Sequence, residues 1–350
     1  MLVKKNFRDP WYPTSVIPGA PDASRWLRAE PRRTLADGVL RRILSRALPH
    51  SRVSEALPLT GGLRNANFKL RLETGRAVVL RIYEHDASLC QKEIDLLRLL
   101  DGAVPVPGVI HAEPRGLDEI PPFAVLEYVD GIDFRELRHG GATGAIAEAA
   151  ESAGEVLTAI GRFRFPKAGW LGPGPGVTAP LVEGADPMPR FLDLCLASAN
   201  LCRRMPAEVR AGLHALAWAQ APVLANLERE PRLVHGDFNG GNLVVRHDSG
   251  RWRVAAVLDW EFAVSSTPLA DLGNFLRYES AARPLLEPHF SKGFRRAGGE
   301  LAGDWRQLAR WTDLLAICES LTHDALPEAA ASELVELARA TLEAREAQCG

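Results

Sequence analysis

Asp237 and Asn242 stand five positions apart in the glycine-rich segment HGDFNGGN, at 235–242. A carboxylate in such a loop can accept the proton of a hydroxyl group, and the oxygen of an amide side chain can bind Mg²⁺. Asp, Asn and Gly are also the commonest turn-forming residues, and short apolar runs flank the segment at 233–234 and 243–245. The segment is therefore either a catalytic loop or a plain turn between two strands, and the rest of the sequence has to decide.

A further acidic residue, Asp259, ends the strongly apolar run VAAVLD, which we expect to be a strand. A carboxylate that emerges from a buried strand needs compensation, which a metal ion can provide, although capping of the next turn is an equally good local explanation. The Asp-x4-Asn spacing of Asp237 and Asn242 is that of a kinase catalytic loop, in which the Asp meets a hydroxyl and the Asn holds Mg²⁺. His235 is expected to brace the loop by hydrogen bonds.

Two features earlier in the chain fit the same chemistry. The turn TGGLRNANF at 60–68 contains Gly61 and Gly62, which leave room for backbone N–H groups to approach phosphate oxygens. Arg81 lies in an expected strand and Glu93 in the next expected helix, and such a pair can hold a positive charge against the phosphates of a nucleotide. Each feature alone fits a hairpin turn or a solvated surface. Their order along the chain favours a catalytic loop over a plain turn.

Three segments of the chain resemble the aminoglycoside phosphotransferase and choline kinase-like family, which shares the protein kinase fold. These segments are LVHGDFNGGNLVV, VLDWEFA and PLADLGNFL. The resemblance covers about residues 50–320 in the order of its elements. It implies an α+β fold of two lobes, with a small β-rich N-lobe and a larger, mostly α-helical C-lobe. We expect residues 1–50 to be an extension with a helix, 51–129 the nucleotide-binding N-lobe, and 130–350 the C-lobe with the catalytic loop and the acceptor-binding helices.

The resemblance also implies a role for each candidate residue. These are Gly61, Gly62, Arg81, Glu93, Glu127 and Tyr128 for nucleotide binding, Asp237 for catalysis, Asn242 and Asp259 for Mg²⁺, and His235 and Asp271 for support of the loop. Glu127 and Tyr128 belong to LEYVDG at 126–131, which resembles the linker whose backbone hydrogen-bonds the nucleotide base. Asp271 resembles the helix-start aspartate that braces the catalytic loop, and N-capping alone is an equally good local account.

Two positions depart from the family pattern. The strand position that usually carries lysine is Arg81, which is always charged and can bind phosphate as a fork but is bulkier. The turn at 60–68 is not the full GxGxxG of protein kinases, and a shortened turn is usual in the family that this chain resembles. Neither departure removes Asp237, Asn242 or Asp259.

The expected elements follow from hydrophobic periodicity and turn residues. We expect helices over 33–50, 86–102, 144–163, 189–204 and 207–230 and three or more after 260, strands over 53–60, 65–73, 76–84 and 251–260 with two short ones before 129, and a structured loop over 166–177. Asp86 is the expected N-cap of the helix over 86–102. Trp170, in the loop over 166–177, either lines the acceptor pocket or anchors the loop.

The composition narrows the class of protein. The chain has 350 residues, 46% of them hydrophobic, and a formal net charge of -2, which argues against a general nucleic-acid binder. Five scattered cysteines in no CxxC spacing fit a reduced, cytoplasmic protein, and no apolar run is long enough for a membrane span. The sequence leaves the oligomeric state open.

The function that these features predict is a small-molecule kinase that uses Mg²⁺ and ATP or GTP to phosphorylate a hydroxyl group. The acceptor is expected to be an aminoglycoside-type antibiotic or an amino-alcohol metabolite. The C-terminal stretch is acidic and contains Asp313, Glu319 and Asp324. It either binds the positively charged amine of such an acceptor or is an ordinary solvated face. Two alternatives are a kinase-fold protein that binds nucleotide without turnover, and a protein kinase, which the short stretch between 259 and 271 disfavours.

Overall fold

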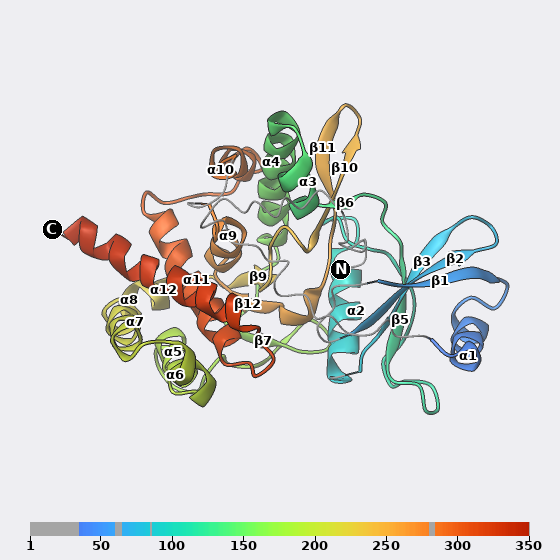
Figure 1. The fold of residues 1–350 in the computed structure, drawn as a ribbon, viewed down its shortest axis with the longest axis horizontal. Coiled ribbons are helices and arrows are strands. Elements are labelled where there is room, and N and C mark those ends of the chain that lie inside the picture. The colour runs from blue at the N-terminus through green and yellow to red at the C-terminus, as the bar shows by residue number, and fades with distance from the viewer. Residues whose placement is uncertain (1–34, 60–64, 85, 280–283, 350) are drawn as a thin grey trace.

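The computed structural model describes residues 35–59, 65–84, 86–279 and 284–349, with a β-rich N-terminal part and a helical C-terminal part (Figure 1). The N-terminal part is an antiparallel five-stranded sheet in the order β1-β2-β3-β5-β4. Its elements are α1 (Asp37–Ala47), β1 (Val53–Leu59), β2 (Ala66–Leu72), β3 (Ala77–Ile82), α2 (Ser88–Leu100), β4 (Val109–Glu113) and β5 (Phe123–Glu127). The predicted α+β fold is confirmed, whereas the domain limits at 50 and 129 stay predictions.

The two faces of this sheet pack against different helices, because successive side chains along a strand point to opposite sides. On one face Ile43 of α1 is fully buried in a cluster with Phe68 of β2. On the other face Ile94 of α2 shares a cluster with Val79 of β3, and Figure 1 shows the sheet between α1 and α2. Arg81 comes two positions after Val79, so it points to the α2 side. Within the described residues, the N-terminal extension is therefore an added helix on the sheet.

The C-terminal part places two small sheets among its helices. The strands are β6 (Ile132–Asp133), β7 (Gly169–Leu171), β8 (Val177–Ala179), β9 (Arg232–Val234), β10 (Leu243–Asp248), β11 (Arg251–Val257) and β12 (Val264–Ser266). The helices are α3 (Phe134–Gly140), α4 (Thr143–Ile160), α5 (Pro187–Leu196), α6 (Ala199–Arg204), α7 (Ala207–Ala219), α8 (Ala221–Leu227), the 3-10 helix η2 (Trp260–Phe262), α9 (Leu269–Leu276), α10 (Glu287–Arg296), α11 (Trp305–Leu321) and α12 (Glu328–Cys349). Among the described helices, none has both the length and the apolar composition to cross a membrane.

Three predicted segments differ from the structure. The helix expected over 189–204 is two helices, since α5 ends and α6 begins on either side of Ala197 and Ser198. The helix expected over 207–230 is interrupted at Gln220, because a proline at the second position of α8 has no N–H with which to continue α7. The loop expected over 166–177 contains β7, which pairs with β12 and β8.

The segment 235–242 is not a hairpin turn. It begins after β9, which belongs to the sheet β8-β7-β12-β9, and ends at β10, which belongs to the sheet β11-β10-β6. A hairpin turn joins two paired strands of one sheet. The segment therefore crosses between two sheets, and its shape depends on contacts with the helices around it.

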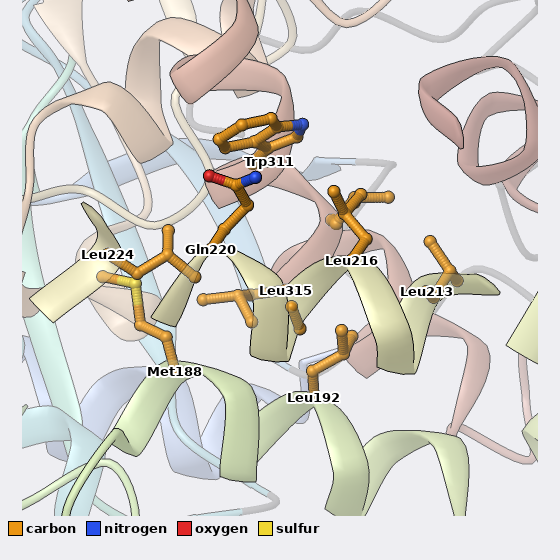
Figure 2. Close-up of a pocket in the computed structure, with 10 residues that line it drawn as sticks. Met188, Leu192, Leu213, Leu216, Gln220, Leu224, Trp311 and Leu315 are labelled. Carbon is orange, nitrogen blue, oxygen red and sulfur yellow. The ribbon is translucent and has the colours of Figure 1, made fainter. Parts of the chain in front are cut away.

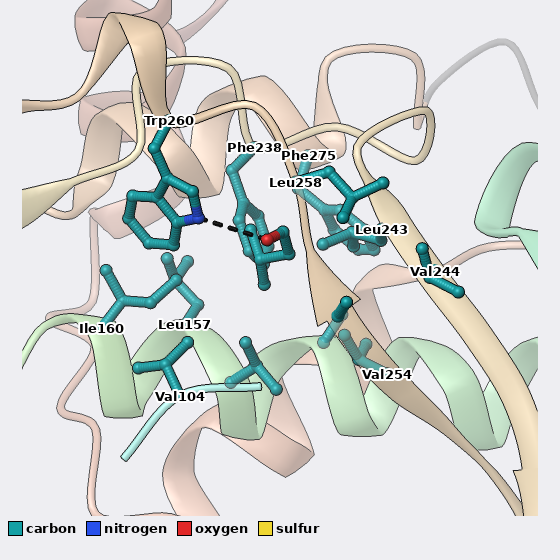
Figure 3. Close-up of a cluster of buried hydrophobic side chains, with 14 of the residues drawn as sticks. Val104, Leu157, Ile160, Phe238, Leu243, Val244, Val254, Leu258, Trp260 and Phe275 are labelled. Atoms are coloured by element: carbon teal, nitrogen blue, oxygen red, sulfur yellow. Dashed lines mark hydrogen bonds between the residues drawn. The ribbon is translucent and has the colours of Figure 1, made fainter. Parts of the chain in front are cut away.

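Two apolar clusters fix the C-terminal part. One joins α5, α7, α11 and α12, and Figure 2 shows the small cavity where Met188, Leu216 and Trp311 from α5, α7 and α11 face one another. The other lies beside the segment 235–242, where Figure 3 shows the ring of Phe238 next to Phe275. The ring centroids of these two residues are 5.8 Å apart, and Phe238 is fully buried. Burial of such a ring stabilises by about 1.5–3 kcal/mol, so Phe238 anchors the segment in the core.

Candidate active site

Two asparagine side chains hold the carboxylate of Asp237. Its Oδ1 accepts a hydrogen bond from Nδ2 of Asn239 at 2.7 Å, and its Oδ2 accepts one from Nδ2 of Asn242 at 2.7 Å. Asn242 also donates to the main-chain carbonyl of Asp237 at 2.9 Å, and Oδ1 of Asn239 accepts from the N–H of Gly241 at 2.8 Å. These bonds fix the plane of the carboxylate within the loop. The sequence reading missed Asn239, which looked like an ordinary turn residue.

His235 braces the loop and carries no charge. The N–H of Asp237 donates to its Nδ1 at 3.2 Å, while its Nε2 lies 3.0 Å from the carbonyl oxygen of Leu258. A nitrogen that accepts and a nitrogen that faces a carbonyl define the neutral ring with its proton on Nε2. Burial lowers the pKa of His235 to about 4, although Asp259 and the Leu258 carbonyl act to raise it. The ring therefore holds Asp237 and Leu258 together and is a poor proton donor at neutral pH.

Helix α9 supports the same loop through Asp271. Its two carboxylate oxygens accept the N–H groups of His235 at 2.7 Å and of Gly236 at 2.9 Å. Gly236 has a φ of 80°, and an added Cβ would collide with the carbonyl oxygen of Phe262, so glycine is required there. Burial raises the pKa of Asp271 to about 7, whereas the two N–H donors act to lower it.

Asp259 lies beside Asn242 because the backbone joins their segments. The N–H of Leu258, the residue before Asp259, donates to the carbonyl of Asn242 at 2.9 Å. Asp259 has a φ of 70°, a left-handed conformation that costs an Asp residue about 1 kcal/mol or more. This backbone lies at the turn from β11 into η2 and directs the carboxylate to Arg81, whose Nη2 lies 2.7 Å from Oδ1 of Asp259.

Arg81 is the centre of a buried group of charges. The residue is 1% exposed, and its Nε lies 3.0 Å from Oε2 of Glu93. Glu93 also accepts a hydrogen bond from the hydroxyl of Tyr83 at 2.6 Å. Although burial acts to lower it, the carboxylates of Asp259 and Glu93 raise the pKa of Arg81 well above its usual value. The predicted Arg81–Glu93 pair is therefore present and buried, and its alternative as two surface residues is wrong.

Three further polar residues of this site were not predicted. Glu261 is buried, its Oε2 accepts a hydrogen bond from Asn65 at 3.0 Å, and Nη2 of Arg81 lies 3.7 Å from it. Lys92 donates to the main-chain carbonyl of Glu261 at 2.8 Å, and burial lowers the pKa of Lys92 to about 8. Glu261 comes two positions after Asp259 and Lys92 comes just before Glu93. This adjacency to predicted site residues is the signal in the sequence that could have found Glu261 and Lys92.

The other residues predicted to bind the nucleotide are Gly61, Gly62, Glu127 and Tyr128. Gly61 and Gly62 lie outside the described residues. Glu127 is exposed at the end of β5, where Arg76 lies 3.2 Å from its carboxylate. Tyr128 follows it, and the ammonium of Lys69 lies 3.6 Å from the centre of its ring. The linker role of these two residues stays a prediction.

The acidic residues expected near the acceptor are already paired. Asp313 forms a buried ion pair with Arg277 at 2.6 Å, Glu319 lies 2.7 Å from His323, and Asp324 accepts a hydrogen bond from Asn200 at 2.6 Å. Of the two readings, an ordinary set of surface and core contacts fits better than a cation site. Trp170 is 38% exposed and contacts the ring of Phe191 edge-on.

The donor set fits Mg²⁺ bound together with phosphates. Both printed hydrogen bonds of the Asn242 amide come from its Nδ2 and go to Asp237, so Oδ1 is the side-chain atom that would bind a metal. Asp259 supplies a carboxylate on the neighbouring segment. Among the described residues, no group of three His, Cys, Asp or Glu side chains could hold a metal by itself. Mg²⁺ is commonly held by one or two side chains plus substrate phosphates, which matches two protein ligands.

The model of the phosphotransferase enzyme family matches residues 55–311, so the chain belongs to that family. The family resemblance that the motifs predicted is thereby confirmed. A search of curated proteins finds no match.

Several solved structures have the same fold. Aminoglycoside phosphotransferase APH(4)-Ia is 19% identical, with a TM-score of 0.65 over 88% of this chain and 99% of its own. A GDP complex of aminoglycoside 2'-phosphotransferase-IIIa is 17% identical, with a TM-score of 0.61 over 90% and 100%. A protein of Thermobifida fusca provisionally identified as a fructosamine-3-kinase is 19% identical, with a TM-score of 0.60 over 88% and 100%. A mutant of the first was solved with AMP-PNP and hygromycin B.

Replacement of Arg81 tests whether it holds the buried carboxylates together. We expect Arg81→Met to lower the free energy of unfolding by about 3–5 kcal/mol, because it leaves Glu93, Asp259 and Glu261 without their shared cation. The control is Arg76→Met, which removes the exposed pair with Glu127 and should cost less than about 1 kcal/mol. Urea denaturation measures both. Equal losses in the two variants would show that burial of Arg81 does not matter.

The neutral state of His235 predicts a dependence of stability on pH. Its pKa is depressed in the folded chain, so the stability it contributes is present above about pH 6.5 and is lost as the pH falls toward 4. The difference corresponds to about 3 kcal/mol. We expect wild type to lose that much more stability than His235→Gln between pH 7 and 4, measured by denaturation at each pH. Parallel curves would contradict the assignment.

Proposed function

We propose that this protein transfers the terminal phosphoryl group of ATP or GTP to a hydroxyl group of a small molecule. The observation that carries the proposal is the hydrogen bond from the N–H of Leu258 to the carbonyl of Asn242. It sets Asp259 beside the loop in which Asn242 holds Asp237. A proton acceptor and two oxygen ligands for Mg²⁺ are thus next to one another, as phosphoryl transfer requires.

In this proposal the residues of the chain act mainly by position and charge. Asp237, held in plane by its two asparagines, orients the acceptor hydroxyl and takes its proton as the new P–O bond forms. The bond between the terminal phosphorus and its bridging oxygen breaks in the same step, and ADP or GDP leaves. Asn242 and Asp259 would hold Mg²⁺, which neutralises charge on the phosphates when it is bound. Arg81 holds the carboxylate of Asp259 from the sheet side of the same site. Glu93 keeps Arg81 in place, and Asp271 and His235 keep the loop in place.

The acceptor class is proposed from the structures with the same fold. Two of the similar structures are aminoglycoside phosphotransferases, and one of them was solved with hygromycin B. These likenesses support a hydroxyl-bearing acceptor such as an aminoglycoside or an amino alcohol, bound by the helices of the C-terminal part. The paired state of Asp313, Glu319 and Asp324 gives no support to a cation pocket at those residues. A screen of nucleotide consumption against aminoglycosides, choline, homoserine and amino sugars identifies the acceptor.

A second candidate is a nucleotide-binding protein without turnover. The direct contact of Arg81 with Asp259 favours it, because this contact competes with a metal for the same carboxylate. The two candidates differ in one result of the screen. Phosphorylated product with any hydroxyl acceptor supports the transferase, and nucleotide binding without product for the whole panel supports the alternative.

Replacement of Asp237 tests its role directly. We expect Asp237→Asn to lower kcat by about 10²–10⁴-fold, because the amide cannot take the proton of the acceptor. The matched control is Asp248→Asn, at the exposed end of β10, which should keep wild-type kcat. Steady-state kinetics with the acceptor from the screen measures both, and circular dichroism checks the fold. Retained turnover in Asp237→Asn would remove this residue from the mechanism.

A further inference from the structure

Helix α9 contacts the catalytic loop at a second point, beyond the bonds of Asp271. Asn274 is 6% exposed and lies one helical turn after Asp271. In the amide orientation that satisfies both of its ends, its nitrogen donates to the carbonyl of Phe238 at 3.2 Å and its oxygen accepts from Nη2 of Arg277 at 2.9 Å. Asp271 holds the peptide groups before Asp237, so α9 grips the loop on both sides of that residue.

Arg277 is itself held by a buried fork. Its Nε donates to Oδ2 of Asp313 at 2.8 Å and its Nη2 donates to Oδ1 at 2.6 Å. The two side chains are 10% and 4% exposed. Although burial acts to lower it, the Asp313 carboxylate raises the pKa of Arg277 above its usual value. A bidentate pair of this kind fixes the direction of the guanidinium plane, and therefore the direction of the bond to Asn274.

Asp313 belongs to α11, and that helix is fixed on two sides. Toward α9 it packs on Gly273, where an added Cβ would collide with the carbonyl of Ala309 and lie 2.7 Å from Cβ of Asp313. Toward α5, α7 and α8, its Trp311 and Leu315 line the apolar cavity of Figure 2. Asp313, which binds Arg277, therefore lies on a helix that is held by the apolar packing of the C-terminal part.

We propose that Asn274, Arg277 and Asp313 form a positioning relay for Asp237. The relay runs from α11 through α9 to the carbonyl of Phe238, the residue that directly follows Asp237. It sets the angle at which the Asp237 carboxylate meets the acceptor hydroxyl, and its members act through the loop without touching a ligand. This inference rests on the proposed phosphotransferase function and extends it to three residues to which the sequence analysis assigned no role in the loop at 235–242.

The physical reason for such a relay is that the reaction rate depends strongly on the position of the reacting group. A displacement of about 1 Å at the reacting group can cost about 100-fold in rate. The loop bridges two sheets and has no hairpin pairing of its own, so its peptide groups need other partners. The N–H groups of His235 and Gly236 and the carbonyl of Phe238 all find theirs on α9.

The first test compares two asparagines that each donate to a main-chain carbonyl and accept from an arginine. Asn274→Asp keeps an acceptor for Arg277 but sets a carboxylate oxygen against the Phe238 carbonyl. We expect kcat to fall about 10–100-fold with KM for the nucleotide within about twofold. Asn200 is the control, since its amide also donates to a carbonyl, that of Thr322, and accepts from an arginine, Arg203. Asn200→Asp should leave kcat within about twofold, and an equal loss in both variants overturns the relay.

A second set of variants tests the bidentate ion pair of Arg277 and Asp313, and its result does not depend on whether Asn274→Asp folds. Arg277→Lys keeps the charge but cannot make two parallel hydrogen bonds, so we expect an intermediate fall in kcat. Combining it with Asp313→Glu, which lengthens the acid where the base is shorter, should restore part of the rate. A double variant no better than Arg277→Lys contradicts the proposed direction of the relay.

A measurement without substrate separates this inference from the proposed function. Amide hydrogen exchange of 235–242 should be about tenfold faster in Asn274→Asp than in wild type, and unchanged in Asn200→Asp. Unchanged exchange in Asn274→Asp overturns the relay even if the chain is an active phosphotransferase. Faster exchange supports the relay even if wild type shows no transfer to any acceptor.

Discussion

The contact of Arg81 with Glu93 and Asp259 is the interaction on which the site depends. One guanidinium, on β3, reaches a carboxylate on α2 through Nε and a carboxylate after β11 through Nη2. It thereby joins the N-terminal sheet to the segment that would hold the metal. A lysine has a single nitrogen and would place its charge at one point, whereas the planar fork of arginine spans two partners. The departure from the family pattern is thus also one of the physical links between the two parts of the chain.

The segment 235–242, which carries Asp237 and Asn242, depends on a different kind of constraint. Because it runs between two sheets, its peptide groups are held by side chains and by the neighbouring strand end instead of by a hairpin. Asp271, His235 and Asn274 hold its backbone, and Phe238 anchors it in the core. Groups that are fixed before the substrate arrives need no reorganisation during the reaction, which is how such sites lower a barrier. Arg81 thus fixes the segment of Asp259, and α9 fixes the loop at 235–242.

The sequence predicted the local part of this arrangement and missed the part that folding creates. The N-terminal strands and α2 follow from alternation and amphipathic spacing, and the motif order predicted that Asp237, Asn242 and Asp259 share a site. The break at Gln220 was missed because helical periodicity runs through it. Asn65 and Glu261 lie 196 residues apart in sequence, so no local pattern could pair them. From the sequence, Asp313 was interpreted only as an acidic residue near the acceptor. In the structure it forms a buried ion pair with Arg277.

The central claim is that Asn242 and Asp259 bind a nucleotide through Mg²⁺ in front of Asp237. Calorimetric titration of wild type with AMP-PNP, with and without Mg²⁺, tests it most directly. We expect Mg²⁺ to tighten binding by about tenfold or more, equivalent to about 1.4 kcal/mol, and we expect Asp259→Asn to remove that gain while metal-free binding persists. Equal affinity of wild type with and without Mg²⁺, or an undiminished gain in Asp259→Asn, would contradict the account.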